Sequence, residues 1–208
     1  MASAMIHICV AKEVNKKLKM DEKQLFLGTI APDISKHLGK TKYKSHFLNT
    51  LEEDIPNMDK FLEKYKDELS DPFIMGYYIH LFTDLLWQKY FISEIDIDCI
   101  TDSNGNKKKI DHKTFKEYIY SDYTNLNVLL IDHYNLDLSL FYEPLVYPKI
   151  NMDEIPIDEL QVIVDQMGII IQNSKVEKSY YFDLSNIIQF ITMSQEIIKS
   201  EIDKLNFS

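Results

Sequence analysis

The sequence predicts an all-α protein, folded as one multi-helix domain over residues 1–208. Apolar residues recur at helical spacing in several long segments, and capping residues mark the starts of these segments. The chain also has only 5 Gly and 6 Pro, too few for a loop-rich β-sandwich or a disordered chain. The 208 residues are enough to bury one real core, and no repeat or composition change indicates a second domain.

The first two helices are predicted over residues 4–19 and 21–30, with Asp21 as the N-cap of the second. One face of the first helix carries the apolar residues Ile6, Val10, Val14 and Leu18. Pro32 disfavours helical geometry at the residue before it, so we expect the chain to turn at Ala31.

Residues 34–54 are expected to form a long, mostly irregular connection. A third helix is predicted over 58–69. Asp71 as N-cap and Pro72 at the first helical position then indicate the start of a long helix that runs to about residue 95. This helix is apolar on most faces, which is typical of a central, buried helix, so its polar residues need partners.

The second half of the chain is predicted to contain three more long helices. Residues 96–111 form a break in which turn residues and three lysines are compatible with a short hairpin. The predicted helices cover 113–134, 157–174 and 184–205, with a short helix near 138–141.

The net charge of −10 argues against stable binding to nucleic acid, because neutralising phosphates requires clustered Lys and Arg. It does not exclude a nucleic-acid substrate, since bound metal ions can supply positive charge locally. Cys9 and Cys99 are interpreted as free thiols, with a disulfide as the lesser alternative. No apolar signal segment and no stretch long enough to span a bilayer is present, so a cytoplasmic location is expected. The sequence leaves open the oligomeric state and whether residues 1–4 are native.

His80 and Asp84 lie four residues apart in the predicted central helix. Residues at this spacing face the same way, so both side chains can bind one ion. An imidazole together with a carboxylate suits zinc. The alternative is a buried histidine hydrogen-bonded to an aspartate one turn along, without metal.

His7, Asp33 and His46 are the candidate partners of this pair. His7 lies on the first helix, Asp33 follows Pro32 at a turn, and His46 lies in the irregular connection. For Asp33 alone, a cap or Asx-turn role is the alternative. The combination is more informative, because an apolar helix that carries His and Asp needs polar partners.

Four segments in this order resemble the zinc-dependent phospholipase C family, whose fold is shared with single-strand-specific nucleases. They are His7 on the first helix, LGTIAPD at residues 27–33, SHF at residues 45–47 and GYYIHLFTD at residues 76–84. The resemblance implies a zinc site formed by Asp33, His46, His80 and Asp84. It further implies that Asp84 bridges to a second metal bound by His7, which in the secreted enzymes also takes the free amino end of the chain.

The sequence departs from the family pattern downstream. No His follows soon after Asp84, and no HxxxE or HxxxD motif completes a third metal position. Asp122 is a candidate substitute ligand, with a surface or capping role as the alternative. One or two zinc ions are therefore expected rather than three.

The resemblance predicts hydrolysis of a phosphoester, with a small phosphoester or a phospholipid head group as substrate. Asp33 is the candidate general base, since a carboxylate near the attacking water can accept its proton. Tyr77 and Tyr78 are candidates for lining the substrate pocket, with core packing as the alternative. Two other functions stay open: a catalytically reduced protein whose structural zinc supports a binding module, and a helical protein without metal.

Overall fold

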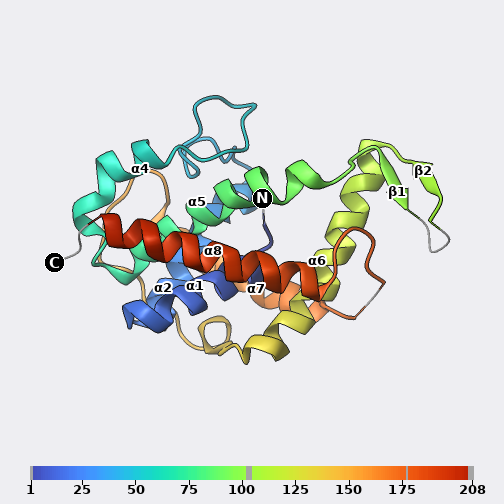
Figure 1. The fold of residues 1–208 in the computed structure, drawn as a ribbon. Coiled ribbons are helices and arrows are strands. Elements are labelled where there is room, and N and C mark those ends of the chain that lie inside the picture. Colours follow the sequence, from blue (N-terminus) through green and yellow to red (C-terminus); the bar gives the residue numbers. More distant parts are fainter. Residues whose placement is uncertain (1, 102–104, 177, 206–208) are drawn as a thin grey trace.

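The computed structural model describes residues 2–101, 105–176 and 178–205 and folds them into packed helices with one small sheet (Figure 1). The helices are α1 (Ala4–Leu18), α2 (Glu22–Ile30), α3 (Ile34–His37), α4 (Met58–Tyr65), α5 (Pro72–Tyr90), α6 (His112–Tyr134), α7 (Leu160–Asn173) and α8 (Leu184–Lys204). Short 3₁₀ turns cover Ala31–Asp33, Lys66–Glu68, Ile92–Glu94, Ser139–Phe141 and Ile157–Glu159. The predicted all-α class is confirmed.

The predicted helix starts are found with their caps. The side chain of Asp21 accepts a hydrogen bond from the Gln24 amide, and that of Asp71 accepts from Phe73 and Ile74, with Pro72 in the first turn. These bonds satisfy amide groups that have no partner inside the helix. α5 ends at Tyr90, five residues before the predicted end, and a 3₁₀ turn follows it.

The expectation of a non-helical Ala31 is wrong. Ala31 has φ −56° and ψ −37°, which is right-handed helical geometry. The chain passes from α2 through a 3₁₀ turn into α3, so Pro32 tightens the helix without ending it. Proline is tolerated here because its ring lies in the first turn of this new segment. Residues 38–57 then form the expected irregular connection.

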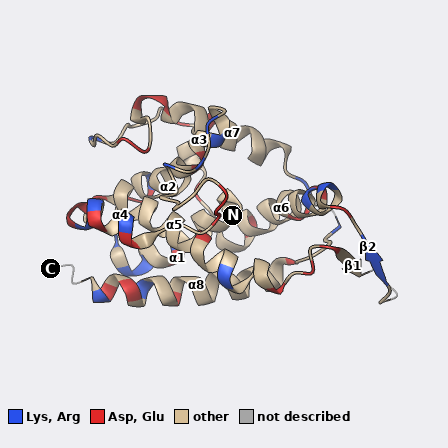
Figure 2. Ribbon diagram, turned by 90° about the horizontal axis from the view of Figure 1, so that it is seen from above, with Lys and Arg blue, Asp and Glu red and all other residues tan. Residues whose placement is uncertain are grey.

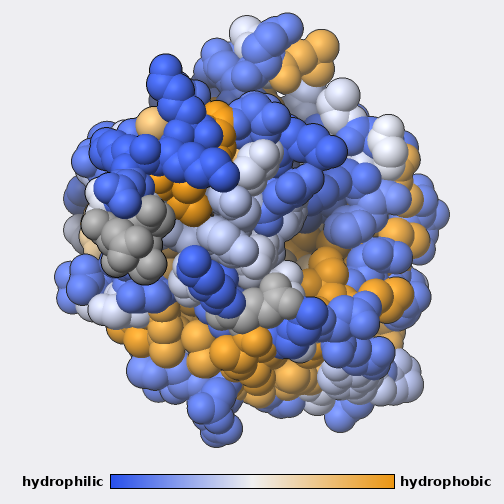
Figure 3. Space-filling view, turned by 90° about the vertical axis from the view of Figure 1, so that its right-hand side faces the viewer, coloured by the Kyte–Doolittle hydropathy of each residue, from blue (hydrophilic) through white to orange (hydrophobic). Residues whose placement is uncertain are grey.

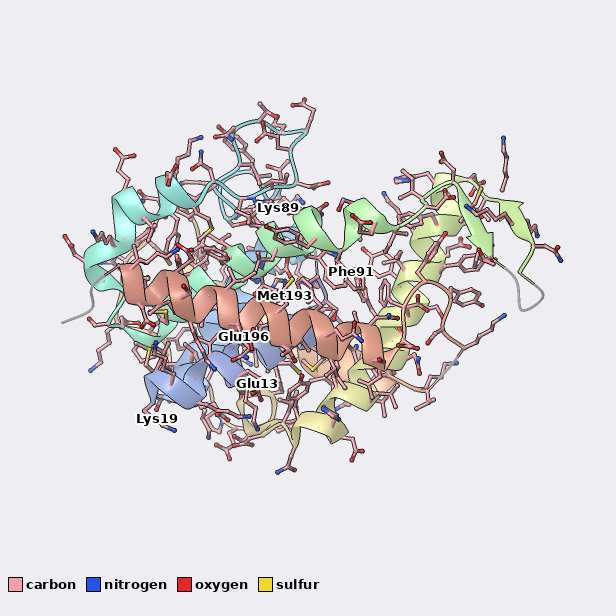
Figure 4. All side chains as sticks on the ribbon, in the orientation of Figure 1. Glu13, Lys19, Lys89, Phe91, Met193 and Glu196 are labelled. Carbon is pink, nitrogen blue, oxygen red and sulfur yellow. The ribbon has the colours of Figure 1, made fainter. Side chains whose placement is uncertain are left out.

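α5 is the central helix and packs against α1, α2, α4 and α8. Its aromatic side chains form part of the core at both ends. Trp87 stacks on Phe91, with ring centroids 4.2 Å apart, and meets Phe190 of α8 edge to face (Figure 4 labels Phe91). Large buried side chains such as these each stabilise the fold by about 2–3 kcal/mol.

α2 and α5 approach until their backbones touch. A Cβ added at Gly28 would lie 1.9 Å from the Phe73 carbonyl oxygen, and one at Gly76 would lie 2.0 Å from the Leu25 carbonyl oxygen. Only glycine fits at both positions. This contact fixes the end of α2, and therefore the turn that carries Asp33, against α5.

The expected hairpin is present as an antiparallel pair, β1 (Cys99–Thr101) with β2 (Lys107–Lys109), in which Cys99 is opposite Lys109. The predicted turn residues 102–104 lie outside the described residues. Cys9 and Cys99 are both free thiols, as expected.

Charged residues lie mainly on the outside (Figure 2), and the long helix α5 carries only two of them, Asp84 and Lys89. The face seen in Figure 3 combines hydrophilic surface with separate apolar patches. Within the described ranges, no helix is long and apolar enough to cross a membrane.

Candidate metal centre

Five sequence-predicted residues converge from four segments of the chain. His7 comes from α1, Asp33 from the 3₁₀ turn, His46 from the irregular connection, and His80 and Asp84 from α5. His7, His80 and Asp84 are fully buried, and His46 is 1% exposed. Among these five residues, only Asp33 reaches the surface, and its side chain is 16% exposed.

His80 and Asp84 occupy one face of α5, with Nε2 and Oδ2 3.6 Å apart. The His7 ring stacks on the His80 ring, with centroids 4.0 Å apart and planes at 16°. Two polypeptide segments distant in sequence thus present nitrogen and oxygen atoms to the same small volume.

Hydrogen bonds from the core hold the segment that carries His46. The Tyr77 hydroxyl donates to the Ser45 carbonyl oxygen, and the Ser35 hydroxyl lies 3.2 Å from that of Ser45. The Ser45 hydroxyl is also 3.0 Å from Nδ1 of His46. Without these contacts an irregular segment could not place an imidazole with precision.

The same hydrogen bonds define which nitrogens are free. Nδ1 of His80 lies 2.7 Å from the Thr29 carbonyl oxygen, which can only accept, so Nδ1 carries the proton. The Ser45 hydroxyl lies 3.3 Å from the Lys42 carbonyl oxygen and 3.0 Å from Nδ1 of His46, and its single proton can be donated to either acceptor. Nε2 of His80 is then bare, and it faces Nε2 of His46 at 3.2 Å, a distance that fits either a hydrogen bond from His46 or a cation held by two bare nitrogens. Two lone pairs at this distance repel unless a cation lies between them.

The surrounding distances are compatible with four ligand atoms around one metal ion. Zinc bound at 2.0–2.1 Å by nitrogen and oxygen places its ligand atoms about 3.4 Å apart. His46 Nε2 lies 3.6 Å from Asp84 Oδ2 and 3.7 Å from Asp33 Oδ1. With the 3.2 Å and 3.6 Å distances from His80, all four measured edges are close to this value.

The second carboxylate oxygen of Asp84 faces another donor set. Its Oδ1 lies 3.3 Å from Nε2 of His7 and accepts a hydrogen bond from the Ala2 amide at 2.9 Å. Asp84 therefore presents one oxygen to each of two sets, which is the arrangement of a bridging carboxylate. His7, His80 and Asp84 also form a ligand group of their own.

Several buried polar atoms of this centre lack a hydrogen-bond partner. Among the described residues they include both ring nitrogens of His7, Oδ1 of Asp33 and Oδ2 of Asp84. Leaving such a group without a partner costs about 1–3 kcal/mol, and more when it is charged. A cation beside His46 and His80 would satisfy the oxygens of Asp33 and Asp84, and a second one beside Asp84 would satisfy Nε2 of His7.

Burial and neighbouring charges shift the protonation of the centre in a direction that suits metal binding. Burial, with His7 alongside, lowers the pKa of His80 to about 3, and burial also lowers the pKa of His46. Burial opposes ionisation of Asp84, but the adjacent His7 outweighs it and the pKa of Asp84 is lowered. Neutral imidazoles and an ionised carboxylate are the forms that bind metals.

A hollow of about 550 Å³ opens beside the centre, and Asp33 is the one member of the five that lines it. Its walls come from the residues before α1, from α3, from the end of α5 and from α6 and α7. The hollow thus reaches the centre at Asp33.

Asp122, proposed as a substitute ligand, lies in neither ligand group. It is buried, and its carboxylate accepts hydrogen bonds from the amides of Tyr180, Tyr181 and Phe182 at 2.7, 2.8 and 3.3 Å. This also corrects the alternative of a surface or capping acid. Its role is to hold the segment before α8, although burial raises its pKa against these bonds.

Tyr77 and Tyr78 are core residues and do not line the hollow. Both are at most 1% exposed. Tyr77 packs against Phe61 and donates to the Ser45 carbonyl, so it holds the segment that carries His46. Sequence patterns did not predict this contact. They also did not predict that the Thr29 carbonyl holds His80 or that the Ala2 amide donates to Asp84.

Comparison with known proteins finds no matching family, no matching curated protein and no matching solved structure.

Proposed function

We propose that this protein is a zinc-dependent hydrolase of phosphoesters, a phosphodiesterase of the kind that the resemblance to the phospholipase C family implies. One observation carries the proposal. The Nε2 atoms of His46 and His80 face each other at 3.2 Å, and carboxylate oxygens of Asp33 and Asp84 surround them without hydrogen-bond partners.

One or two zinc ions are proposed. Asp33, His46, His80 and Asp84 would hold the first, with the edges expected for tetrahedral coordination. His7 and the second oxygen of Asp84 would hold the other. The hydrogen bond from His80 to the Thr29 carbonyl fixes that ring in the tautomer that such coordination needs, and the contact of Ser45 with Nδ1 of His46 orients the second ring.

A bound zinc ion lowers the pKa of a coordinated water and polarises phosphoryl oxygens. The protein residues supply the rest. Asp33 lines the hollow and is proposed to accept the proton of the attacking water, because its carboxylate is the only one of the centre in contact with that space. The buried His7, His80 and Asp84 exclude bulk water from the other side of the centre.

The proposal extends to the fold type. In the family that the sequence resembles, the first helix and a long central helix supply metal ligands. Here α1 and α5 lie in contact and bring His7 and His80 into stacking distance. This agreement supports a fold of the phospholipase C and single-strand nuclease type.

The test is the zinc content of protein purified without a metal-affinity tag, measured by elemental analysis. We expect two zinc ions per chain in the wild type, and loss of both in Asp84→Ala, since one carboxylate faces both donor sets. His133→Ala, which changes an exposed histidine at the end of α6, is the matched control and should keep both ions.

Activity is measured on the same samples with a chromogenic phosphodiester. Asp33→Asn is expected to lower kcat by at least about a hundredfold, as for loss of a general base. One tightly held zinc without any hydrolysis would instead favour a structural zinc in a binding module. Protein that takes up no metal under zinc-replete conditions would contradict the proposal.

A further inference from the structure

The space beside Asp33 has two parts of different chemistry. The large hollow of about 550 Å³ has mainly apolar walls. They include Ile92 after α5, Ile119 on α6, and Ile163, Met167 and Ile170 on α7. A smaller hollow of about 250 Å³ is lined by Pro32, Asp33, Lys36, Lys40 and Lys42. The two share Asp33 and Lys36, so they meet at the mouth of the candidate metal centre.

The smaller hollow is cationic in a chain of net charge −10. Lys42 forms an ion pair with Asp54. Lys36 and Lys40, by contrast, form no ion pair with any described residue. The Lys36 ammonium lies 3.4 Å from the hydroxyl of Tyr120 and 5.4 Å from the centre of that ring, which keeps it at the junction of the two hollows.

We propose that the centre takes phosphodiesters with an apolar group on one side of the phosphorus and a second negatively charged group on the other. This inference rests on the proposed function. The apolar group occupies the large hollow, and the second anion lies against Lys36 and Lys40. The phosphorus lies between them, beside Asp33, where the two hollows meet.

The charges also disfavour a quaternary ammonium head group in the small hollow. Such a cation is bound by acids or by open aromatic faces. The one acid of the small hollow, Asp33, belongs to the metal centre, and Lys36 covers the face of Tyr120. Like charges brought together here would weaken binding.

Paired ligands that differ in the second charge test the inference. Dihexanoyl phosphatidylinositol phosphate is compared with dihexanoyl phosphatidylcholine, and a thymidine dinucleotide with a terminal phosphate is compared with one without it. Each is titrated calorimetrically into the zinc-loaded protein, and hydrolysis is followed separately. The lipid and nucleotide pairs distinguish the two sources of this chemistry.

We expect the anionic member of at least one pair to bind about tenfold more tightly than its partner, the effect of one charge-assisted hydrogen bond. Lys36→Gln and Lys40→Gln should each remove most of that preference. Lys108→Gln, on the exposed strand β2, should keep it. The preference should also weaken as salt is raised.

Equal affinity within both pairs, or an unchanged preference in both lysine variants, would overturn the inference even if hydrolysis is observed. A charge preference that depends on Lys36 and Lys40, without hydrolysis of any ligand, would support the binding inference while the proposed hydrolytic function fails.

Discussion

The residue that connects the whole centre is His80. Its Nδ1 proton is engaged by the Thr29 carbonyl, its ring stacks on His7, and its Nε2 faces His46. Because its Nδ1 proton is engaged, the neutral His80 imidazole presents the lone pair of Nε2 toward His46, where it can bind a cation. The same arrangement makes the metal-free protein sensitive to acid.

Acid should destabilise the metal-free protein. Burial lowers the pKa of His80 from 6.5 to about 3 and also lowers that of His46. Between pH 6.5 and about 3 the unfolded chain binds protons that the folded chain does not, so the free energy of unfolding falls as pH falls. Within this window His80 alone contributes about 1.4 kcal/mol per pH unit.

Urea unfolding in the presence of a chelator, repeated across this pH range, measures the slope. His80→Asn should make it shallower, because one titrating imidazole is removed. A stability that is independent of pH across the range would argue against neutral, buried imidazoles.

Asp122 gives a second residue-scale prediction. Asp122→Ala removes the acceptor of three backbone amides and should destabilise the protein by about 3 kcal/mol, seen as a lower Tm. Its zinc content should equal that of the wild type. A loss of zinc in a variant that still folds would restore Asp122 as a ligand.

At the scale of elements, the contact between α2 and α5 positions the centre. Thr29 near the end of α2 holds His80 of α5, and Asp33 follows α2 by three residues. Gly28 and Gly76 permit the backbones to touch. The distance between Asp33 and the two imidazoles is therefore set by how closely two helices pack.

Gly76→Ala should force these helices apart, since the new Cβ would lie 2.0 Å from the Leu25 carbonyl oxygen. We expect a loss of about 3 kcal/mol or more in the free energy of unfolding, and weaker zinc binding. Gly168→Ala on α7 is the matched control. Its Cβ would meet the Phe141 carbonyl at 3.7 Å, an ordinary contact, so it should stabilise the protein by up to about 1 kcal/mol. Equal stabilities in denaturant titrations would refute the close packing.

For the whole molecule, we expect the proposed metal binding to be coupled to folding stability. The ligands come from α1, the turn after α2, the irregular connection and α5, so unfolding separates all of them. Zinc at about a thousandfold its Kd should add about 4 kcal/mol to the stability and raise the Tm. Thermal unfolding with zinc and with a chelator measures this difference. His80→Ala should show no zinc-dependent rise, and a wild type that behaves in the same way would contradict the centre.

Sequence patterns were sufficient to predict those features of the structure that depend on residues close together in the chain. Helical spacing and the caps Asp21 and Asp71 predicted most helices to within a few residues, and the four-residue spacing predicted that His80 and Asp84 share a face. Local rules failed at Ala31, because Pro32 begins a new helical turn there. They also failed for Asp122, whose partners lie 58 to 60 residues away.

The sequence by itself therefore determined the all-α class, the buried character of α5 and the residue types able to bind a metal. It did so because periodicity, capping and side-chain chemistry act within a few residues. Only the tertiary structure decided that Asp84 faces two donor sets, that His46 and His80 meet through their Nε2 atoms, and that Asp33 lines the hollow. These features depend on how α1, α2 and α5 pack against one another. That packing brings together residues that are far apart in the sequence, and no local pattern predicts it.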